Sequence, residues 1–257
     1  MREYSKYITL TKNGRGIYSL DTVFGCKTGL KDNKKGCYND CYSARIAKKY
    51  GYDFSVNVLR GFKNEKHIIK IIKDINNVDL PFIRIGSNGD PSENWEHTIT
   101  ILEKLKGIKK EIVIITRHWN KLTLNQLNRI SKLNICINTS VSALDESVLL
   151  NSCLSEYERI KPYCKSILRV VSCDFNIDNK IGLQKSLIQE ELFKKYKVLD
   201  TVFRVFKSNQ LVKKGIINIS KTKFIGKECY VSKYNRKTFF GKCSSCLEMC
   251  GINIKQE

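Results

Sequence analysis

Short apolar runs alternate with amphipathic segments along most of the chain. The runs are rich in Ile, Val and Phe and are bounded by turn residues, a pattern typical of buried strands, whereas apolar residues spaced three or four apart indicate helices. The pattern predicts six strands, at residues 19–25, 81–87, 111–117, 134–141, 165–173 and 200–206. It predicts helices between them, at residues 42–50, 64–75, 93–105, 123–133, 145–160 and 183–196.

Residues at the helix ends sharpen several of these boundaries. Asp40 and Gly51 are expected to begin and end the first helix, and Ser92 is expected to cap the third. Thr123 with Gln126 predicts a capping box at the start of the fourth.

Strands that are almost continuously apolar and separated by helices predict an α/β fold with a parallel sheet. Six such units favour a partial (βα)6 TIM-like barrel over residues 1–207, with a cysteine-rich, metal-binding extension over residues 208–257 that packs on it. The alternative is an open, doubly wound sheet. In both folds the carboxyl ends of the strands form the functional edge.

Composition narrows the functional classes. The 257 residues include 46 Lys and Arg against 25 acidic residues, a net charge of +21 that favours nucleic acid as a partner. The abundance of Lys, Ile and Asn is equally what an AT-rich coding sequence leaves. No apolar run reaches the roughly 18 residues of a membrane span, so we expect a cytoplasmic protein without a membrane partner. Eleven cysteines in a reducing compartment are then expected to be ligands, catalytic groups or buried thiols.

Three of these cysteines follow the first predicted strand. Cys26, Cys37 and Cys41 are spaced C-x10-C-x3-C, and Gly25 and Gly36 directly precede two of them. Three thiolates are one fewer than a structural zinc ion requires, so a distant fourth cysteine would have to complete a zinc site. An iron-sulfur cluster held by three cysteines would instead leave one iron open for an exchangeable ligand.

A cysteine loop after the first strand of such a fold, with Tyr42 directly after the last cysteine, resembles the radical S-adenosylmethionine (SAM) superfamily over roughly residues 17–207. The resemblance implies that Cys26, Cys37 and Cys41 hold a [4Fe-4S] cluster whose open iron binds the amino and carboxylate groups of SAM, with Tyr42 near the adenine. The usual superfamily spacing is C-x3-C-x2-C, so this loop is longer. CYNDC followed by YSAR also resembles a group of uncharacterised phage-encoded cysteine-rich proteins.

The same resemblance suggests further cofactor contacts. Ser87 or Asp90, in RIGSNGDP, would receive the amino group of SAM, although Asn88-Gly89 and Asp90-Pro91 are also ordinary turn residues. Asn138 and Ser140, with Ser142, alternate at the end of the fourth strand and would hold the ribose, or else only fill a barrel mouth.

Arginines and one histidine complete the candidates. Arg169 lies inside an apolar run and requires a partner, either the carboxylate of SAM or a buried acid. Arg84, Arg117 and Arg204 occupy other strands in the same way, so the four would converge on an anion or pair with helix acids. His118 follows the third strand and is the candidate proton donor among the three histidines.

A second cysteine group occupies the C-terminal segment. Cys229, Cys243, Cys246 and Cys250 are spaced C-x13-C-x2-C-x3-C, which predicts a second metal site, either a [4Fe-4S] cluster or zinc.

The sequence therefore predicts a radical SAM enzyme that reductively cleaves SAM and directs a 5′-deoxyadenosyl radical at a substrate, with nucleic acid or a nucleotide among the candidates. A flavodoxin or ferredoxin is the implied electron donor. The competing hypothesis is a non-catalytic iron-sulfur or zinc protein that binds nucleic acid through its charge.

Overall fold

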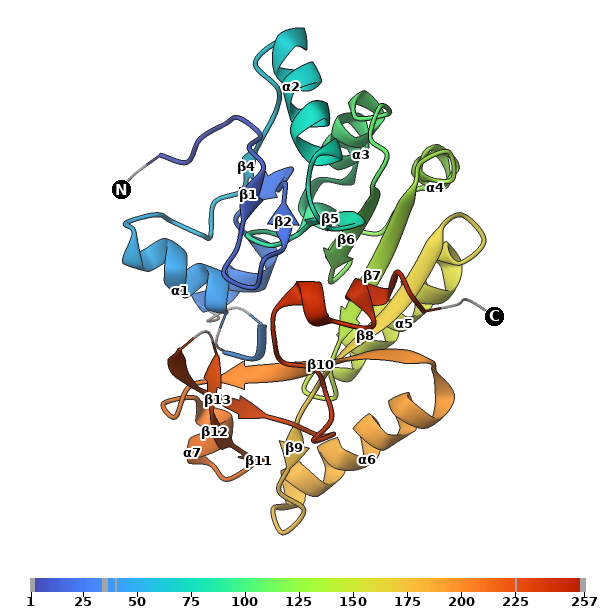
Figure 1. The fold of residues 1–257 in the computed structure, drawn as a ribbon. Coiled ribbons are helices and arrows are strands. Elements are labelled where there is room, and N and C mark those ends of the chain that lie inside the picture. Colours follow the sequence, from blue (N-terminus) through green and yellow to red (C-terminus); the bar gives the residue numbers. More distant parts are fainter. Residues whose placement is uncertain (1–2, 34–36, 40, 225, 255–257) are drawn as a thin grey trace.

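The computed structural model describes residues 3–33, 37–39, 41–224 and 226–254 (Figure 1). Its largest element is a nine-stranded sheet with the order β1-β2-β5-β6-β7-β8-β10-β13-β12. Six neighbouring strands are parallel and follow the order of the chain: β2 (Tyr18–Ser19), β5 (Phe82–Ile85), β6 (Glu111–Thr116), β7 (Ile135–Val141), β8 (Lys165–Ser172) and β10 (Val198–Val205).

Antiparallel strands extend the sheet at both sides. They are β1 (Thr11–Lys12) beside β2, β13 (Lys227–Ser232) beside β10, and β12 (Ser220–Phe224) at the outer edge. Two small sheets pair β3 (Val23–Phe24) with β4 (Val58–Leu59) and β9 (Asp174–Phe175) with β11 (Ile217–Asn218). The segment after residue 207 thus shares the main sheet through β13 and β12.

The helices are α1 (Tyr42–Lys49), α2 (Glu65–Asn76), α3 (Trp95–Lys104), α4 (Leu124–Ile130), α5 (Ser147–Ile160), α6 (Lys180–Lys195) and α7 (Gln210–Lys213). Short 3-10 helices cover Thr28–Asn33, Cys37–Asn39, Pro91–Asn94, Cys243–Ser245 and Met249–Gly251. The α/β class and the mostly parallel sheet predicted from the sequence are therefore confirmed.

Helix caps follow the prediction in part. The capping box of Thr123 and Gln126 is present in full. Ser92 as the cap of the third helix is wrong, because Pro91 begins a 3-10 turn that Asp90 caps, and Asn94 then caps α3 by accepting from the backbone N–H of His97. Asp40 lies outside the described residues, and Cys41 stands at the N-cap of α1.

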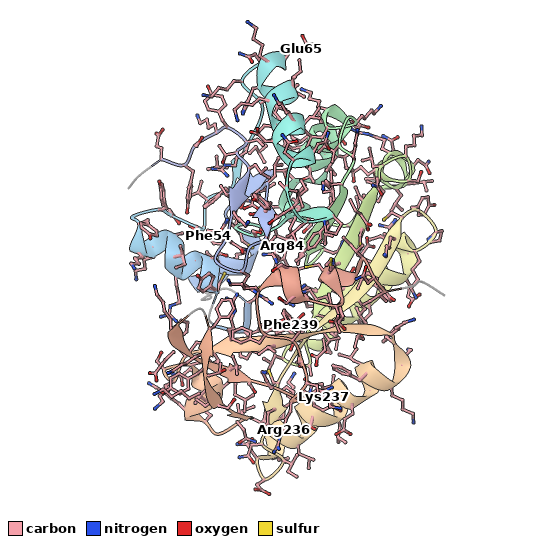
Figure 2. All side chains as sticks on the ribbon, in the orientation of Figure 1. Phe54, Glu65, Arg84, Arg236, Lys237 and Phe239 are labelled. Atoms are coloured by element: carbon pink, nitrogen blue, oxygen red, sulfur yellow. The ribbon has the colours of Figure 1, made fainter. Side chains whose placement is uncertain are left out.

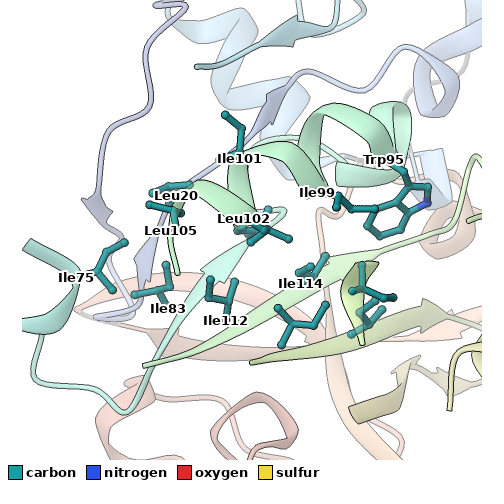
Figure 3. Packing of buried hydrophobic residues seen from close by; sticks show 14 of the residues in the cluster. Leu20, Ile75, Ile83, Trp95, Ile99, Ile101, Leu102, Leu105, Ile112 and Ile114 are labelled. Atoms are coloured by element: carbon teal, nitrogen blue, oxygen red, sulfur yellow. The ribbon is translucent and has the colours of Figure 1, made fainter. Parts of the chain in front are cut away.

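One face of the parallel strands packs against the helices. Alternate residues of each strand point to this face, such as Ile83 and Ile85 of β5 and Ile112 and Ile114 of β6. They meet apolar side chains of α2, α3 and α4 in the main core cluster (Figure 3). Val141, Leu168 and Val170 continue the same face against α5 and α6.

The other face is covered by the C-terminal segment. Phe82, Val113, Cys136, Ile167 and Leu199 lie on this face and pack against Met249, Cys250, Ile252 and Ile254. Figure 1 shows α2 to α6 following one another around the outer side of the sheet, with the red C-terminal segment on its other side. We call this second face the tail-covered face. No helix in the described part of the chain is long and apolar enough to cross a membrane.

Candidate active site

A cavity of about 450 Å³ opens on the tail-covered face. Its walls come from β1, β2, β5, β6, β8, β10 and β12, from the start of α1 and from the C-terminal segment. Cysteines of both sequence groups line it: Cys37 and Cys41 of the first, and Cys243, Cys246 and Cys250 of the second. The two groups that the sequence treats separately therefore face a common space.

Close backbone contacts hold the start of the first cysteine loop. The backbone N–H of Gly25 donates to the carbonyl of Asn88 (3.0 Å), and that of Cys26 donates to the carbonyl of Phe54 (2.9 Å). Gly25 also forms an isolated parallel bridge with Gly89. The loop that carries Cys26 is thereby tied to the loop after β5.

Gly25 has no room for a side chain. Its φ is +96°, and an added Cβ would lie 2.2 Å from the carbonyl oxygen of Val56. We expect Gly25→Ala to lower the free energy of unfolding by more than the roughly 1–3 kcal/mol that backbone strain alone costs. The matched control is Gly51→Ala, because Gly51 has φ +78° but open space around it. Urea unfolding of both variants checks this, and equal losses would contradict a role for the close approach.

Cys37 and Cys41 of the first loop line the cavity, whereas Cys26 does not. Burial raises the pKa of Cys37 to about 11, although Arg117 opposes the rise and Cys41 adds to it. Burial likewise raises the pKa of Cys26, with further contributions from Asp90 and Cys37. Among the described residues, no three His, Cys, Asp or Glu side chains are arranged around one common ion position.

A buried ion pair anchors the loop next to Cys37. The guanidinium of Arg117 donates to both carboxylate oxygens of Asp145 (2.6 and 3.2 Å) and also to the hydroxyl of Tyr38. The Tyr38 ring meets Phe203 edge to face at 5.6 Å. Arg117 therefore pairs with an acid, as the alternative from the sequence allowed, and is not among the residues that line the cavity.

Tyr42, Ser87 and Arg169, three of the predicted cofactor contacts, line the cavity wall. Tyr42 begins α1 and lies under the guanidinium of Arg204, 4.8 Å from its ring centroid. Ser87 accepts a hydrogen bond from Nε of Arg84 (3.1 Å). Its loop is held by Asp21, whose carboxylate accepts from the backbone N–H groups of residues 86–88.

Asp90 is not part of the cavity wall. Its carboxylate is buried and accepts four hydrogen bonds, from the backbone and hydroxyl of Ser92, the hydroxyl of Thr116 and the backbone N–H of Arg117. We therefore correct its role: Asp90 ties the turn after β5 to the end of β6. Ser87 is the better candidate for the cofactor contact.

Asn138 and Ser140 are buried on β7 and do not belong to the cavity wall either. The side-chain N–H of Asn138 donates to the carbonyl of Cys250 (3.0 Å), so this residue holds the C-terminal segment on the sheet. Its Oδ1 is buried without a hydrogen-bond partner among the described residues. The backbone carbonyl of Ser140 accepts from Arg117, at 3.3 Å.

Four arginines line the cavity: Arg15, Arg84, Arg169 and Arg204. The sequence predicted three of them and missed Arg15, which lies in the turn between β1 and β2 and donates through Nε to the carbonyl of Gly241 (3.0 Å). Burial lowers the pKa of Arg169, and the charges of Arg84 and Arg15 lower it further. Burial lowers the pKa of Arg204 as well, and the charges of Arg15 and Arg84 lower it further.

His118 is not in the cavity, so its predicted role as a proton donor there is wrong. It is buried between α3 and β7, with its ring 5.8 Å from that of Trp95 and its Nε2 3.0 Å from the hydroxyl of Thr139. Burial lowers its pKa from the ordinary 6.5 to about 3. The imidazole therefore stays neutral in the folded protein.

This burial makes stability depend on pH. Between pH 6.5 and pH 3 the unfolded chain protonates His118 while the folded protein does not, so stability present above pH 6.5 is lost as the pH falls. One site contributes a slope of about 1.4 kcal/mol per pH unit in that range. We expect His118→Asn, which suits the local φ of +50°, to reduce the slope. Urea unfolding at pH 7 and pH 5 measures this slope of the unfolding free energy against pH. An equal slope in the wild type and in His118→Asn would exclude His118 as the cause.

The second cysteine group is only partly assembled around the cavity. Burial raises the pKa of Cys243, and the neighbouring Cys250 and Cys246 raise it further. Cys229 lies on β13, does not line the cavity, and has Arg204 as its charged neighbour. Three of the four predicted ligands therefore share one region, and Cys229 stands apart from them.

Phenylalanines and two carboxylates complete the wall. The rings belong to Phe82, Phe203, Phe224, Phe239 and Phe240, and the acids are Asp200 and Glu248. Figure 2 shows Arg84 and Phe239 close together near the middle of the molecule. Nothing in the local sequence distinguishes Phe82, Phe203, Asp200 or Glu248 from core or surface positions, because these residues reach the cavity only through the sheet and the C-terminal segment.

Comparison of the chain with protein-family models, with curated proteins and with solved structures returns no match.

Proposed function

We propose that this protein is a radical SAM enzyme. The observation that carries the proposal is the meeting of the cysteine loop with the cavity: Cys37, Cys41 and Tyr42 line the same space as Ser87 and Arg169. These are residues to which the superfamily resemblance assigns the cluster and the cofactor.

The arrangement of the sheet supports the partial barrel. Six parallel strands stand in chain order, and α2 to α6 cover only one of their faces. A doubly wound sheet would place helices on both faces. A sheet covered on one side by helices and hollowed on the other is what a partial barrel requires, with its ligands inside.

The donor set suits an iron-sulfur cluster. Cys26, Cys37 and Cys41 supply three sulfurs, and a [4Fe-4S] cluster binds each thiolate through a different iron, so its ligands need not surround one ion position. When bound, the cluster supplies the electron that breaks the sulfonium bond of SAM, giving methionine and a 5′-deoxyadenosyl radical that takes a hydrogen atom from the substrate. A flavodoxin or ferredoxin would provide that electron.

The chain's own residues would bind and orient SAM. The guanidinium of Arg169 suits the carboxylate, the hydroxyl of Ser87 suits the ammonium group, and the exposed ring of Tyr42 suits the adenine. The phenylalanines restrict water around the reacting atoms, which protects a radical from side reactions.

The C-terminal cysteines would hold a second [4Fe-4S] cluster or a zinc ion. Cys243, Cys246 and Cys250 already line the cavity, and Cys229 would complete the set from β13. Since the C-terminal segment also covers the sheet, a metal there would stabilise the wall of the cavity.

Anaerobic purification tests the proposal directly. The protein should be brown, with a broad visible absorbance that bleaches on reduction, and dithionite with SAM should yield 5′-deoxyadenosine. A colourless protein with stoichiometric zinc would overturn it. Binding of nucleic acid that weakens steeply with salt and needs no cysteine of the first loop would favour the non-catalytic alternative.

A further inference from the structure

The four arginines of the cavity wall carry charge that the protein itself does not neutralise. Among the described residues, no carboxylate forms a salt bridge with Arg15, Arg84, Arg169 or Arg204. Three arginines outside the cavity are paired with acids: Arg117 with Asp145, Arg129 with Glu96 and Glu103, and Arg159 with Glu156. Arg60 also lies outside the cavity and has no salt bridge among the described residues, so what distinguishes the cavity is the gathering of four such arginines around one space, which suits an anionic ligand.

Composition strengthens this point. The chain contains 35 Lys and 11 Arg, so lysine is the ordinary cation of this protein. Among the described residues that line the cavity, four are nevertheless arginines and none is a lysine. Arginine differs from lysine in its planar fork of donors, which binds carboxylate and phosphate oxygens in pairs. The composition bias that explains the surface therefore does not explain the cavity.

The charge balance specifies the ligand further. Counting guanidinium and carboxylate groups alone, and leaving the cysteines out, the wall has four positive charges against the two carboxylates of Asp200 and Glu248, an excess of two. Asp200 is also engaged by the hydroxyls of Ser172 and Thr238. SAM brings one carboxylate together with an ammonium and a sulfonium, so it does not remove the excess. A phosphate monoester, with a charge of about −1.5 to −2 at pH 7, does.

Aromatic rings lie beside these cations. The Phe224 and Phe240 rings are 4.9 Å apart, and the guanidinium of Arg15 lies 5.9 Å from the centroid of Phe240. Phe239 lines the same wall and is half-buried. Base stacking on such rings contributes about 1–3 kcal/mol per base. Guanidinium groups next to half-buried rings match a phosphate joined to a planar base.

We propose that the cavity binds a nucleoside monophosphate, with the phosphate held by Arg15, Arg84 and Arg204 and the base packed on Phe239 and Phe240. Its role as the substrate rests on the function proposed above, whereas its binding does not. The volume of about 450 Å³ lies within the range of small-molecule sites, roughly 300–1,000 Å³.

Equilibrium binding to the full-length, anaerobically purified protein tests this without SAM or reductant. The probes are the four nucleoside 5′-monophosphates, the matching nucleosides, ribose 5-phosphate, inorganic phosphate and a single-stranded oligonucleotide. At least one monophosphate should bind about 10-fold or more tightly than its nucleoside, as charged hydrogen bonds require, and more tightly than ribose 5-phosphate. Equal binding of nucleoside and monophosphate, or binding of the oligonucleotide alone, would overturn the proposal.

Two variants assign the binding to the cavity. Arg204→Gln removes a charge from the cavity wall. It should lower the affinity for the monophosphate about 10-fold and leave the affinity for the nucleoside unchanged. Arg236→Gln removes the same charge from an exposed position outside the cavity wall, so it should change neither of these two affinities. Unfolding curves show whether Arg204→Gln folds, and Arg84→Lys is the second variant if it does not. If the folded cavity variants still bind the monophosphate as much more tightly than the nucleoside as the wild type does, the cavity is not the phosphate site.

The outcomes separate this inference from the proposed function. Monophosphate binding by a protein that never yields 5′-deoxyadenosine overturns the radical reaction and keeps the ligand class. Cleavage of SAM by a protein that binds no monophosphate overturns the ligand class alone.

Discussion

Cys41→Ala is expected to abolish the formation of 5′-deoxyadenosine. Cys41 stands at the N-cap of α1 and lines the cavity, so its loss leaves two thiolates where the proposed cluster needs three. Loss of a group that only supports a ligand costs about 10–100-fold, and loss of a ligand should therefore cost more than about 100-fold. Iron content, visible absorbance and product yield after anaerobic reconstitution measure the effect.

The control for this variant is another cysteine. Cys164 is half-buried in the helix-covered core and lies outside the cavity wall, so Cys164→Ala should keep both the absorbance and the product. Cys250→Ala separates the two cysteine groups, because it should lower the metal content while the first loop keeps its thiols. Normal product yield from Cys41→Ala would refute the role of the loop.

Local sequence information was sufficient for most of the fold. The apolar runs of β5 to β8 are strong signals because both faces of these strands are largely buried. Thr123 and Gln126 identified a helix start because a capping box is a local interaction. The first strand was the exception. The strand predicted at residues 19–25 is replaced by β2 and β3, which belong to different sheets.

The site was less predictable because its residues are brought together by the sheet. Arg117 and Arg169 look alike in sequence, each a cation at or inside an apolar strand, yet Arg117 meets a helix-side acid and Arg169 faces the cavity. Arg117 directly follows the end of β6, whereas Arg169 lies in the middle of β8, and the neighbours that each side chain meets come from distant parts of the chain. Asp90 illustrates the same limit, because its four donors come from three separate positions along the chain.

Asp21 shows a signal that the sequence did contain. It is an acid two residues after β2, inside the run predicted as the first strand, and its buried carboxylate holds the loop of Ser87 by accepting from three successive backbone N–H groups. A carboxylate at the functional edge of a parallel strand is an observable feature of sequence. Its role as a loop anchor, and not as a ligand, depends on the loop after β5, which the sequence did not place beside it.

The pair of Arg117 and Asp145 links the stability of the fold to the site. Both side chains are almost fully buried, and Asp145 also accepts from the backbone N–H of Ser142 (2.8 Å). Asp145→Asn keeps this last bond but leaves the guanidinium of Arg117 buried without a counter-charge. Removing one partner of a buried pair costs about 3–5 kcal/mol, and we expect Asp145→Asn to lower the free energy of unfolding by that amount.

Two comparisons test this origin of the loss. In the double variant Arg117→Met with Asp145→Asn, neither charge remains, so most of the stability should return. Glu158→Gln removes the acid of an exposed pair with Lys161 and should cost less than about 1 kcal/mol. Because Arg117 also holds the hydroxyl of Tyr38, which neighbours Cys37, Asp145→Asn should retain less iron than Glu158→Gln after reconstitution. Urea unfolding midpoints and iron content measure both effects, and a double variant no more stable than Asp145→Asn would contradict the buried charge as the cause.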